Sequence, residues 1–205
     1  MHDQARDFTI FVKNILGEYF INKNVLDVGS GDINGNNRFL FDGCNYEGND
    51  VIQANNVTIV SMTKDLPFED NSLDTIISTE CFEHDPEYKE SLQKIYKMLK
   101  PDGLFCFTCA STGRREHGTR RTNPADSYGT IGSIDTMVDY YKNLTESDLN
   151  NVLPLNSLFS AWDTYYNAET CDLYFVGIKR GNSLIRRLNI YVNRHVTNTS
   201  GNVGV

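Results

Sequence analysis

The sequence predicts an α/β fold, in which a mostly parallel β-sheet carries helices on both faces. From residue 25 to about residue 110, short apolar runs typical of strands alternate with helical segments. A strand–helix–strand unit joins parallel strands through a right-handed crossover. A glycine-rich turn follows the first apolar run, at the place where such sheets bind ligands. After the alternation, two strand-like runs follow each other through a short connection, which predicts an antiparallel pair at one edge.

Periodicity locates the elements of the first half. Residues 3–20 place apolar side chains at helical spacing, which predicts an amphipathic helix that stops near Gly17 or soon after. A further helix is expected to begin within 36–41, before Asp42-Gly43. Strands are expected at 25–29, 45–50, 56–60 and 72–79.

The second half begins with the clearest helix of the chain, at 88–100. Its apolar side chains form one stripe, and Pro101-Asp102-Gly103 ends it before a strand at 104–110. Thr145 and Asp148 form a capping box for a helix at about 145–152. The two closing strand-like runs are 157–167 and 171–179.

Length and composition predict one domain over residues 1–180, with an N-terminal helix within 1–22, and a C-terminal arm at 181–205. We expect no signal peptide, because the chain does not start with a basic stretch followed by a continuous apolar run. The apolar runs are too short to cross a membrane, so a cytoplasmic location is expected. The net charge of −8 argues against a nucleic-acid partner.

The five cysteines predict neither a disulfide framework nor a metal site. They are odd in number and scattered along the chain. Cys106 and Cys109 form a C-x-x-C pair within an expected strand, where side chains three positions apart point to opposite faces. We therefore expect buried structural thiols, and no metal.

The glycine turn after the first strand predicts a ligand site. Gly29 and Gly31 lack side chains, so the backbone can approach a ligand closely. The spacing to Gly35 differs from the G-x-G-x-x-G pattern of dinucleotide folds, and Asp32 would meet a bound pyrophosphate. The turn thus favours a cationic or zwitterionic ligand, and an NAD-dependent oxidoreductase is the less favoured alternative.

This turn is the first of a series of motifs. LDVGSGD is followed in order by YEGND, DLPFEDNSLDTIIST, FEH and LKPDGLF. The series resembles the class I S-adenosylmethionine-dependent methyltransferases, especially the small-molecule branch, over roughly residues 24–110. The resemblance implies a Rossmann-like, mostly parallel seven-stranded sheet with an antiparallel edge strand, and S-adenosyl-L-methionine as the cofactor. DINGNNR and HGTRRT further resemble a subgroup found with glycan-modifying enzymes.

The resemblance also assigns cofactor-binding residues. Asp27, Gly29 and Gly31, with Ser30 between the glycines, match the motif that holds the methionine portion of the cofactor. Asp50 ends the second strand, as does the acid that binds the ribose hydroxyls in the family. A carboxylate suits that role because it accepts hydrogen bonds from both hydroxyls.

The adenine end departs from the family pattern. Many relatives place an Asp before the LPF segment, where this chain has Met62. We therefore expect the backbone at Met62, or neighbouring Thr63, to contact the adenine. Glu80 and Glu83 are expected to order their loop or to contact the cofactor. The missing Asp leaves open a non-catalytic, cofactor-binding partner subunit.

Two histidines are candidates for the general base. Methyl transfer from a sulfonium is an in-line displacement, and a hydroxyl acceptor must lose a proton. His84 follows the fourth strand, and His117 lies in a long segment without periodicity, which in a compact domain is typical of a functional loop. We name residues 110–140 the lid segment and expect His117 to be the first candidate, with His84 the second.

The lid segment also predicts the acceptor. Four arginines surround His117, at Arg114, Arg115, Arg120 and Arg121. Guanidinium groups bind phosphate and carboxylate in a bidentate manner, which favours an anionic acceptor, and Tyr140 and Tyr141 would stack on it. We expect O-methylation of a sugar, sugar phosphate or nucleotide-linked sugar, with a homodimer as one open possibility. The alternative is a solvated loop whose arginines pair with surface acids.

Overall fold

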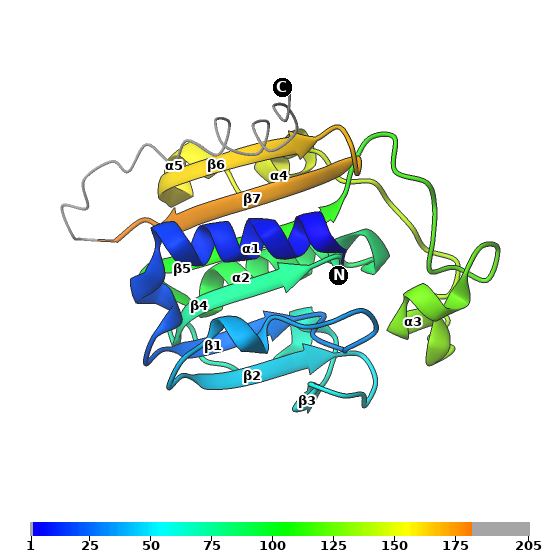
Figure 1. Cartoon of the computed structure of the whole chain (residues 1–205), viewed down its shortest axis with the longest axis horizontal. Coiled ribbons are helices and arrows are strands. Elements are labelled where there is room, and N and C mark those ends of the chain that lie inside the picture. Colours follow the sequence, from blue (N-terminus) through cyan, green and yellow to red (C-terminus); the bar gives the residue numbers. More distant parts are fainter. Residues whose placement is uncertain (1, 182–205) are drawn as a thin grey trace, which may run out of the picture.

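The protein is built around one seven-stranded sheet (Figure 1). The computed structural model describes residues 2–181. The sheet has the order β3-β2-β1-β4-β5-β7-β6. Its strands are β1 (Asn24–Val28), β2 (Asn45–Asp50), β3 (Ile59–Val60), β4 (Leu73–Thr79), β5 (Leu99–Ala110), β6 (Phe159–Asn167) and β7 (Asp172–Lys179).

The direction of the strands confirms the predicted fold class. Strands β1 to β5 pair in parallel, whereas β7 is antiparallel to both β5 and β6. The antiparallel strand is second from the edge, because β6 extends the sheet beyond it. Parallel strands place their carboxyl ends at the same edge, so the turns after β1, β2 and β4 gather there.

Helices cover both faces of the sheet (Figure 1). The helices are α1 (Asp3–Ile15), α2 (Tyr88–Met98), α3 (Tyr128–Ile131), α4 (Glu146–Val152) and α5 (Leu155–Leu158), of which α3 lies beside the strand ends and not on a face of the sheet. The predicted first helix ends at Ile15, and a short 3-10 helix at Gly17–Phe20 follows it. The capping box of α4 is present as predicted, with Thr145 and Asp148 bonding reciprocally.

Each face has its own hydrophobic core. Helix α1 packs Phe8 and Val12 in one cluster with Cys106, and α2 packs Leu92 in the other with Cys109. Both cysteines are fully buried on opposite faces of β5, as the spacing predicted. These two layers fix the sheet, and with it the positions of the strand ends.

The prediction of a helix within 36–41 is wrong. The structure has only a 3-10 turn at Arg38–Leu40. Polar side chains of this segment bond to nearby backbone and so compete with helical bonding: the N–H of Gly35 donates to Asp32 and that of Arg38 donates to Asn36. The β1–β2 connection is therefore a loop, and its conformation is set by these local bonds.

Two further boundaries differ by at least three residues from those predicted. The strand expected at 56–60 is reduced to Ile59–Val60, because Asn56 adopts a positive φ of 69° and bonds to the turn after β1. Strand β5 begins at Leu99, earlier than expected.

The predicted arm at 181–205 lies outside the described residues except for Gly181, so it stays a prediction. Within residues 2–181, no helix has the length and apolarity needed to cross a membrane.

The lid segment follows β5 and lies beside the carboxyl ends of β1, β2 and β4, where α3 is labelled in Figure 1. Backbone hydrogen bonds hold its two ends. The N–H of Leu144 donates to Ala110 O at 2.9 Å, and that of Lys142 donates to Glu83 O at 2.9 Å. The segment is thus attached to the sheet next to the turn after β4.

Candidate active site

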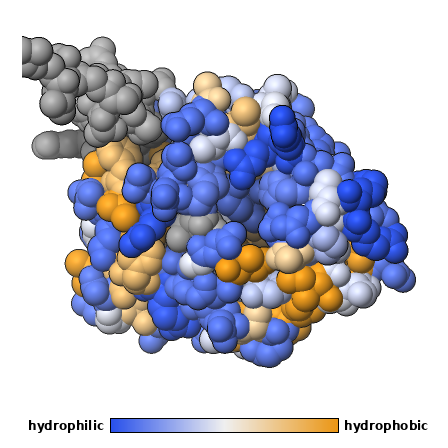
Figure 2. Space-filling model, turned by 45° about the vertical axis from the view of Figure 1, so that its right-hand side comes forward, coloured by the Kyte–Doolittle hydropathy of each residue, from blue (hydrophilic) through white to orange (hydrophobic). Residues whose placement is uncertain are grey.

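A cavity of about 420 Å³ opens at the carboxyl ends of the central strands. Figure 2 views this side of the molecule, where a largely hydrophilic surface is hollowed near its middle. The volume lies in the range of small-molecule sites, roughly 300–1,000 Å³. The residues predicted from sequence that line it are Asp27, Gly29, Ser30, Gly31, Asp50, Met62, Thr63, Glu80, His84, Arg114, Arg115 and His117.

The glycine turn and Asp50 meet at one wall of this cavity. The N–H of Gly31 donates to Oδ2 of Asp50 at 3.0 Å, and the N–H of Val51 donates to Oδ1 at 2.8 Å. Burial raises the pKa of Asp50, while these two hydrogen bonds oppose the rise. Ser30 is held by its N–H, which donates to Asn49 O at 2.9 Å. The carboxylate is therefore fixed in the cavity wall, opposite the turn.

Asp27 has a supporting position beneath the turn. It is 1 % exposed and accepts hydrogen bonds from the Tyr46 hydroxyl at 2.5 Å and from Asn37 Nδ2 at 3.1 Å. Burial raises its pKa to about 6, against the effect of these bonds. The Oδ1 atom of Asn37 is buried, has no hydrogen-bond partner within residues 2–181, and belongs to a residue that lines the cavity. It offers an acceptor to a positively charged ligand group.

The residues expected at the adenine also line the cavity. Met62 precedes the 3-10 turn Thr63–Asp65. The Thr63 hydroxyl donates to Asn49 Oδ1 at 3.3 Å, so its own orientation is fixed by β2. This part of the wall has no carboxylate in the place where many relatives have an Asp, as the sequence indicated.

An ionic network closes the cavity on the side of α1. Nε2 of His2 lies 2.8 Å from Asp172 Oδ2 and 3.6 Å from Glu80 Oε2. Arg114 contacts the same two acids, at 3.4 and 3.8 Å. Burial lowers the pKa of His2, but the two acids outweigh this effect and raise it to about 9. The network holds the start of α1 against the end of β4 and the start of β7.

The two histidines lie at the end of the cavity next to the lid segment. Their ring centroids are 4.9 Å apart in an edge-to-face arrangement, and the ring of Tyr141 is 5.0 Å from His117. Burial, followed by the charge of His117, lowers the pKa of His84 to about 3. Gly118 permits this approach, since a Cβ there would lie 2.6 Å from Cε1 of His84. The structure thus brings together His84, His117 and Tyr141, which are far apart in sequence.

The four arginines do not act as one group. Arg120 pairs with Asp139, and Arg121 lies 2.8 Å from Glu116 and also pairs with Asp139, outside the cavity lining. Arg114 belongs to the ionic network. Arg115 lines the cavity and forms no ion pair with the residues that the structure describes. Tyr140 and Tyr141 are not part of the lining.

Sequence reasoning missed four residues of this site, which are His2, Asn37, Tyr46 and Tyr128. Asn37 had a signal, because it belongs to the DINGNNR motif. Tyr46 likewise belongs to the YEGND motif, whereas His2 and Tyr128 come to the site only through the fold. The ring of Tyr128, from α3, covers the glycine turn so closely that a Cβ on Gly31 would overlap it. Tyr128 and Gly31 therefore form one side of the cavity together.

The sequence comparisons point to a methyltransferase domain. Residues 26–107, from β1 into β5, match the family model described as "Methyltransferase domain". Phosphoethanolamine N-methyltransferase 2 of Caenorhabditis elegans is 38 % identical over 53 residues, which are 26 % of this chain. The matched region spans only 12 % of that curated protein.

The structural comparisons agree with this fold. Burkholderia thailandensis 1,6-didemethyltoxoflavin-N1-methyltransferase, solved with its substrate and S-adenosylhomocysteine, has a TM-score of 0.58 at 17 % identity, covering 87 % of this chain and 79 % of that one. Haemonchus contortus phosphoethanolamine N-methyltransferase 2, in complex with phosphomonomethylethanolamine and S-adenosylhomocysteine, has a TM-score of 0.57 at 14 % identity, covering 85 % and 52 %. At these identities the likeness establishes the fold. The sequence match is to a methyltransferase domain, and both of these structural neighbours were solved with S-adenosylhomocysteine.

Proposed function

We propose that the protein transfers a methyl group from S-adenosylmethionine to an oxygen of a small anionic acceptor, which is a sugar, a sugar phosphate or a nucleotide-linked sugar. The observation that carries this proposal is the cavity itself, in which the turn Gly29–Gly31 faces Asp50 at the strand ends. A methyl donor and a small acceptor would share this one space.

The donor end of the cavity fits the chemistry of S-adenosylmethionine. The cofactor carries a sulfonium and an ammonium, and the lining is rich in carboxylates, among them Asp27, Asp50, Glu80 and Asp85. The unpartnered Oδ1 of Asn37 is an acceptor for the ammonium. Asp50 would accept from the ribose hydroxyls, and Met62 and Thr63 would lie against the adenine. When bound, the cofactor supplies the methyl group.

The acceptor end is assigned to the side of the lid segment. His117 and His84 would handle the proton of the acceptor hydroxyl there, with His117 first. Arg115, whose guanidinium has no ion pair within residues 2–181, would bind the anionic group of the acceptor. Arg114 is held by Glu80 and Asp172, so its role is to shape the wall. Homodimer formation stays a prediction.

A methyl-transfer screen tests the proposal. The full chain is incubated with methyl-labelled S-adenosylmethionine and separate pools of sugar nucleotides, sugar phosphates, neutral sugars and amines. We expect label to enter the anionic sugar pools in an alkali-stable ether bond, and the Asp50→Ala variant to transfer far less. Label in the amine pool alone would contradict O-methylation. Cofactor binding without transfer to any pool would favour a non-catalytic subunit.

A further inference from the structure

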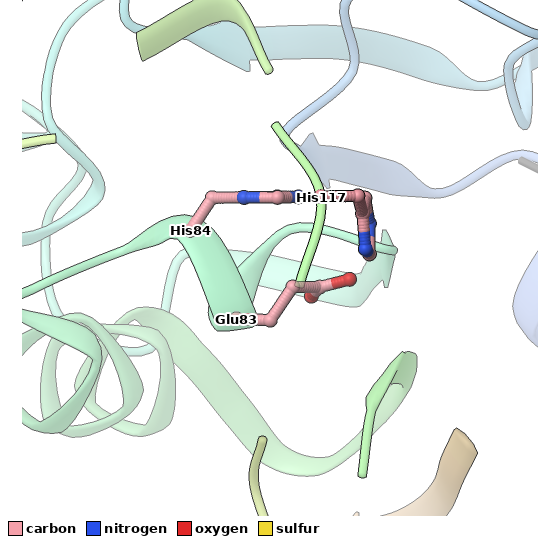
Figure 3. Close-up of side chains that lie close together, drawn as sticks. All are labelled: Glu83, His84 and His117. Atoms are coloured by element: carbon pink, nitrogen blue, oxygen red, sulfur yellow. The ribbon is translucent and has the colours of Figure 1, made fainter. Parts of the chain in front are cut away.

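Three potential metal ligands converge at the acceptor end of the cavity (Figure 3). Glu83 and His84 come from the short 3-10 helix Phe82–His84 after β4, and His117 comes from the lid segment. Each contributes one ligand atom, and these atoms lie within 4.8 Å of one another. In Figure 3 the three side chains point toward a common region from two different parts of the chain.

Buried polar atoms of this group lack hydrogen-bond partners of normal geometry. Glu83 is 0 % exposed, and its carboxylate lies near the backbone N–H groups of Glu83 and Ala110 without forming a hydrogen bond of normal geometry within residues 2–181. Nδ1 of His84 is likewise buried and unpartnered among these residues. Burying a charged carboxylate without a compensating partner is costly, and burial accordingly raises the pKa of Glu83 well above its usual range. The carboxyl group is therefore neutral unless a cation lies between the groups and stabilises its charged form.

The orientation of His117 adds an independent observation. Its Nδ1 lies 3.2 Å from the carbonyl oxygen of Arg115. A carbonyl can only accept, so Nδ1 carries a proton, and in the neutral imidazole the lone pair is then on Nε2. Metal-binding histidines are commonly oriented by such a bond from the second ring nitrogen to a backbone carbonyl.

We propose that Glu83, His84 and His117 bind a divalent transition-metal ion of the zinc or iron type. Two imidazoles and one carboxylate form a common ligand set for such ions and leave coordination positions open for a further ligand. Imidazole ligands favour these metals over magnesium or calcium, which prefer oxygen. The proposal departs from the expectation of no metal, which followed from the cysteine spacing and from the fact that methyl transfer from a sulfonium needs no metal.

A second group of the same residue types gives a contrast. His2, Glu80 and Asp172 also lie within 4.8 Å of one another. There, however, His2 is ion-paired with Asp172 at 2.8 Å, and Arg114 contacts both acids. The positive charges that this group requires are supplied by the protein, so we expect it to bind no metal.

The place of the ion suggests its role, and only this role rests on the proposed function. His84 and His117 line the cavity, whereas Glu83 lies behind the lining. The open coordination positions would face the acceptor, bind one of its oxygens and lower the pKa of the hydroxyl. With the ion bound, the two histidines would act on the acceptor as metal ligands in place of the direct proton transfer proposed above, and the released proton would pass to water.

The test measures metal binding in the full chain, without cofactor or acceptor. Protein freed of metal by a chelator is titrated with Co²⁺, whose visible absorption reports its ligands, and then with Zn²⁺ in competition. We expect one Co²⁺ per chain, displaced by Zn²⁺ but not by Mg²⁺. His117→Ala should weaken Co²⁺ binding at least ~10-fold, the low end of the loss seen when even outer partners of a metal ligand are removed.

Controls separate binding at this site from other outcomes. His117 is only half-buried, so the His117→Ala variant should fold. The thermal unfolding temperature and the binding of S-adenosylhomocysteine are measured in parallel to check that it does. Glu83→Gln provides a second ligand variant. His2→Gln should bind Co²⁺ as the wild type does. Folded wild-type protein that binds S-adenosylhomocysteine but not Co²⁺ would overturn the metal proposal alone, and so would Co²⁺ binding that survives His117→Ala.

Discussion

The backbone N–H of Gly31 donates a hydrogen bond to Oδ2 of Asp50 at 3.0 Å. This bond joins the turn after β1 to the end of β2 and holds the carboxylate in the cavity wall. Because each carboxylate oxygen has more than one acceptor direction, Asp50 can still accept hydrogen bonds from a ligand.

The first prediction concerns Asp50. Asp50→Ala should weaken S-adenosylhomocysteine binding by about 2 kcal/mol, since hydrogen bonds to a charged acceptor contribute roughly 1.5–3 kcal/mol. Isothermal titration calorimetry measures the effect. Asp32→Asn is the matched control, because Asp32 lies in the same turn but outside the cavity lining, and its side chain bonds only to Gly35 and Asn36. Equal affinity in the wild type and Asp50→Ala would remove Asp50 from the cofactor site.

The second prediction concerns the space at Gly31. A Cβ added there would lie 2.7 Å from Asp50 Oδ2 and would overlap the ring of Tyr128. Gly31→Ala should therefore weaken cofactor binding at least ~10-fold, whereas Gly17→Ala, with no atom within 4 Å of the added Cβ, should not.

A double variant distinguishes the two causes of this crowding. If only the ring of Tyr128 is displaced, Gly31→Ala combined with Tyr128→Ala should regain affinity. If the shift of Asp50 is responsible, the double variant should bind as weakly as Gly31→Ala. Wild-type affinity in Gly31→Ala itself would show that the cofactor does not use this turn.

The third prediction separates the lid arginines. Arg115→Gln should raise the KM for an anionic acceptor about 10-fold or more and leave cofactor affinity unchanged. The reason is that, among the four lid arginines, Arg115 forms no ion pair within the described residues and lines the cavity. Arg120→Gln serves as the control, since Arg120 pairs with Asp139 outside the cavity lining. Steady-state kinetics with the acceptor found in the screen measures both. A KM that responds equally to the two substitutions would place the anion elsewhere.

The fourth prediction concerns pH and the ionic network at His2. The pKa of His2 is raised from 6.5 to about 9, so the folded state holds its proton more tightly than the unfolded state does. The resulting stabilisation is complete below pH 6.5 and is lost as the pH rises through about 9. A shift of this size would correspond to about 3 kcal/mol in full, and solvent screening of this partly exposed histidine reduces the contribution below that value.

Urea unfolding of the wild type and His2→Gln across this pH range measures the effect. The difference in free energy of unfolding between the two proteins should shrink as the pH rises, and the N-terminal amine, which titrates in both, cancels. A difference that stays constant with pH would mean that the protonated His2 does not contribute through its charge.

The sequence predicted those parts of the fold that depend on local patterns. The apolar stripe of α2 and the capping box at Thr145 specify helices by periodicity and by a local hydrogen bond, and both are present. The helix expected within 36–41 does not form, because the side chains of Asp32 and Asn36 accept hydrogen bonds from nearby backbone N–H groups. A pattern of apolar residues gives no information on this competition with helical hydrogen bonds.

The site was predicted only in part for a similar reason. Asp50 and the glycines are recognisable because the ends of parallel strands meet at one edge whatever the side chains are. Tyr128 reaches the turn through the path of the lid segment, and His2 meets Asp172 across the full length of the described chain. Contacts between residues so far apart in the sequence produce no short-range pattern from which they could be predicted.

Calorimetric titration of the wild-type chain with S-adenosylhomocysteine, and separately with NAD, tests the central claim most directly. The claim is that the amides after β1 and the acid at the end of β2 hold an adenosyl group joined to a methionine-derived chain. It predicts saturable binding of S-adenosylhomocysteine at one site per chain and no measurable binding of NAD. Folded protein that gives no binding heat with S-adenosylhomocysteine at several temperatures, or that binds NAD instead, would contradict it.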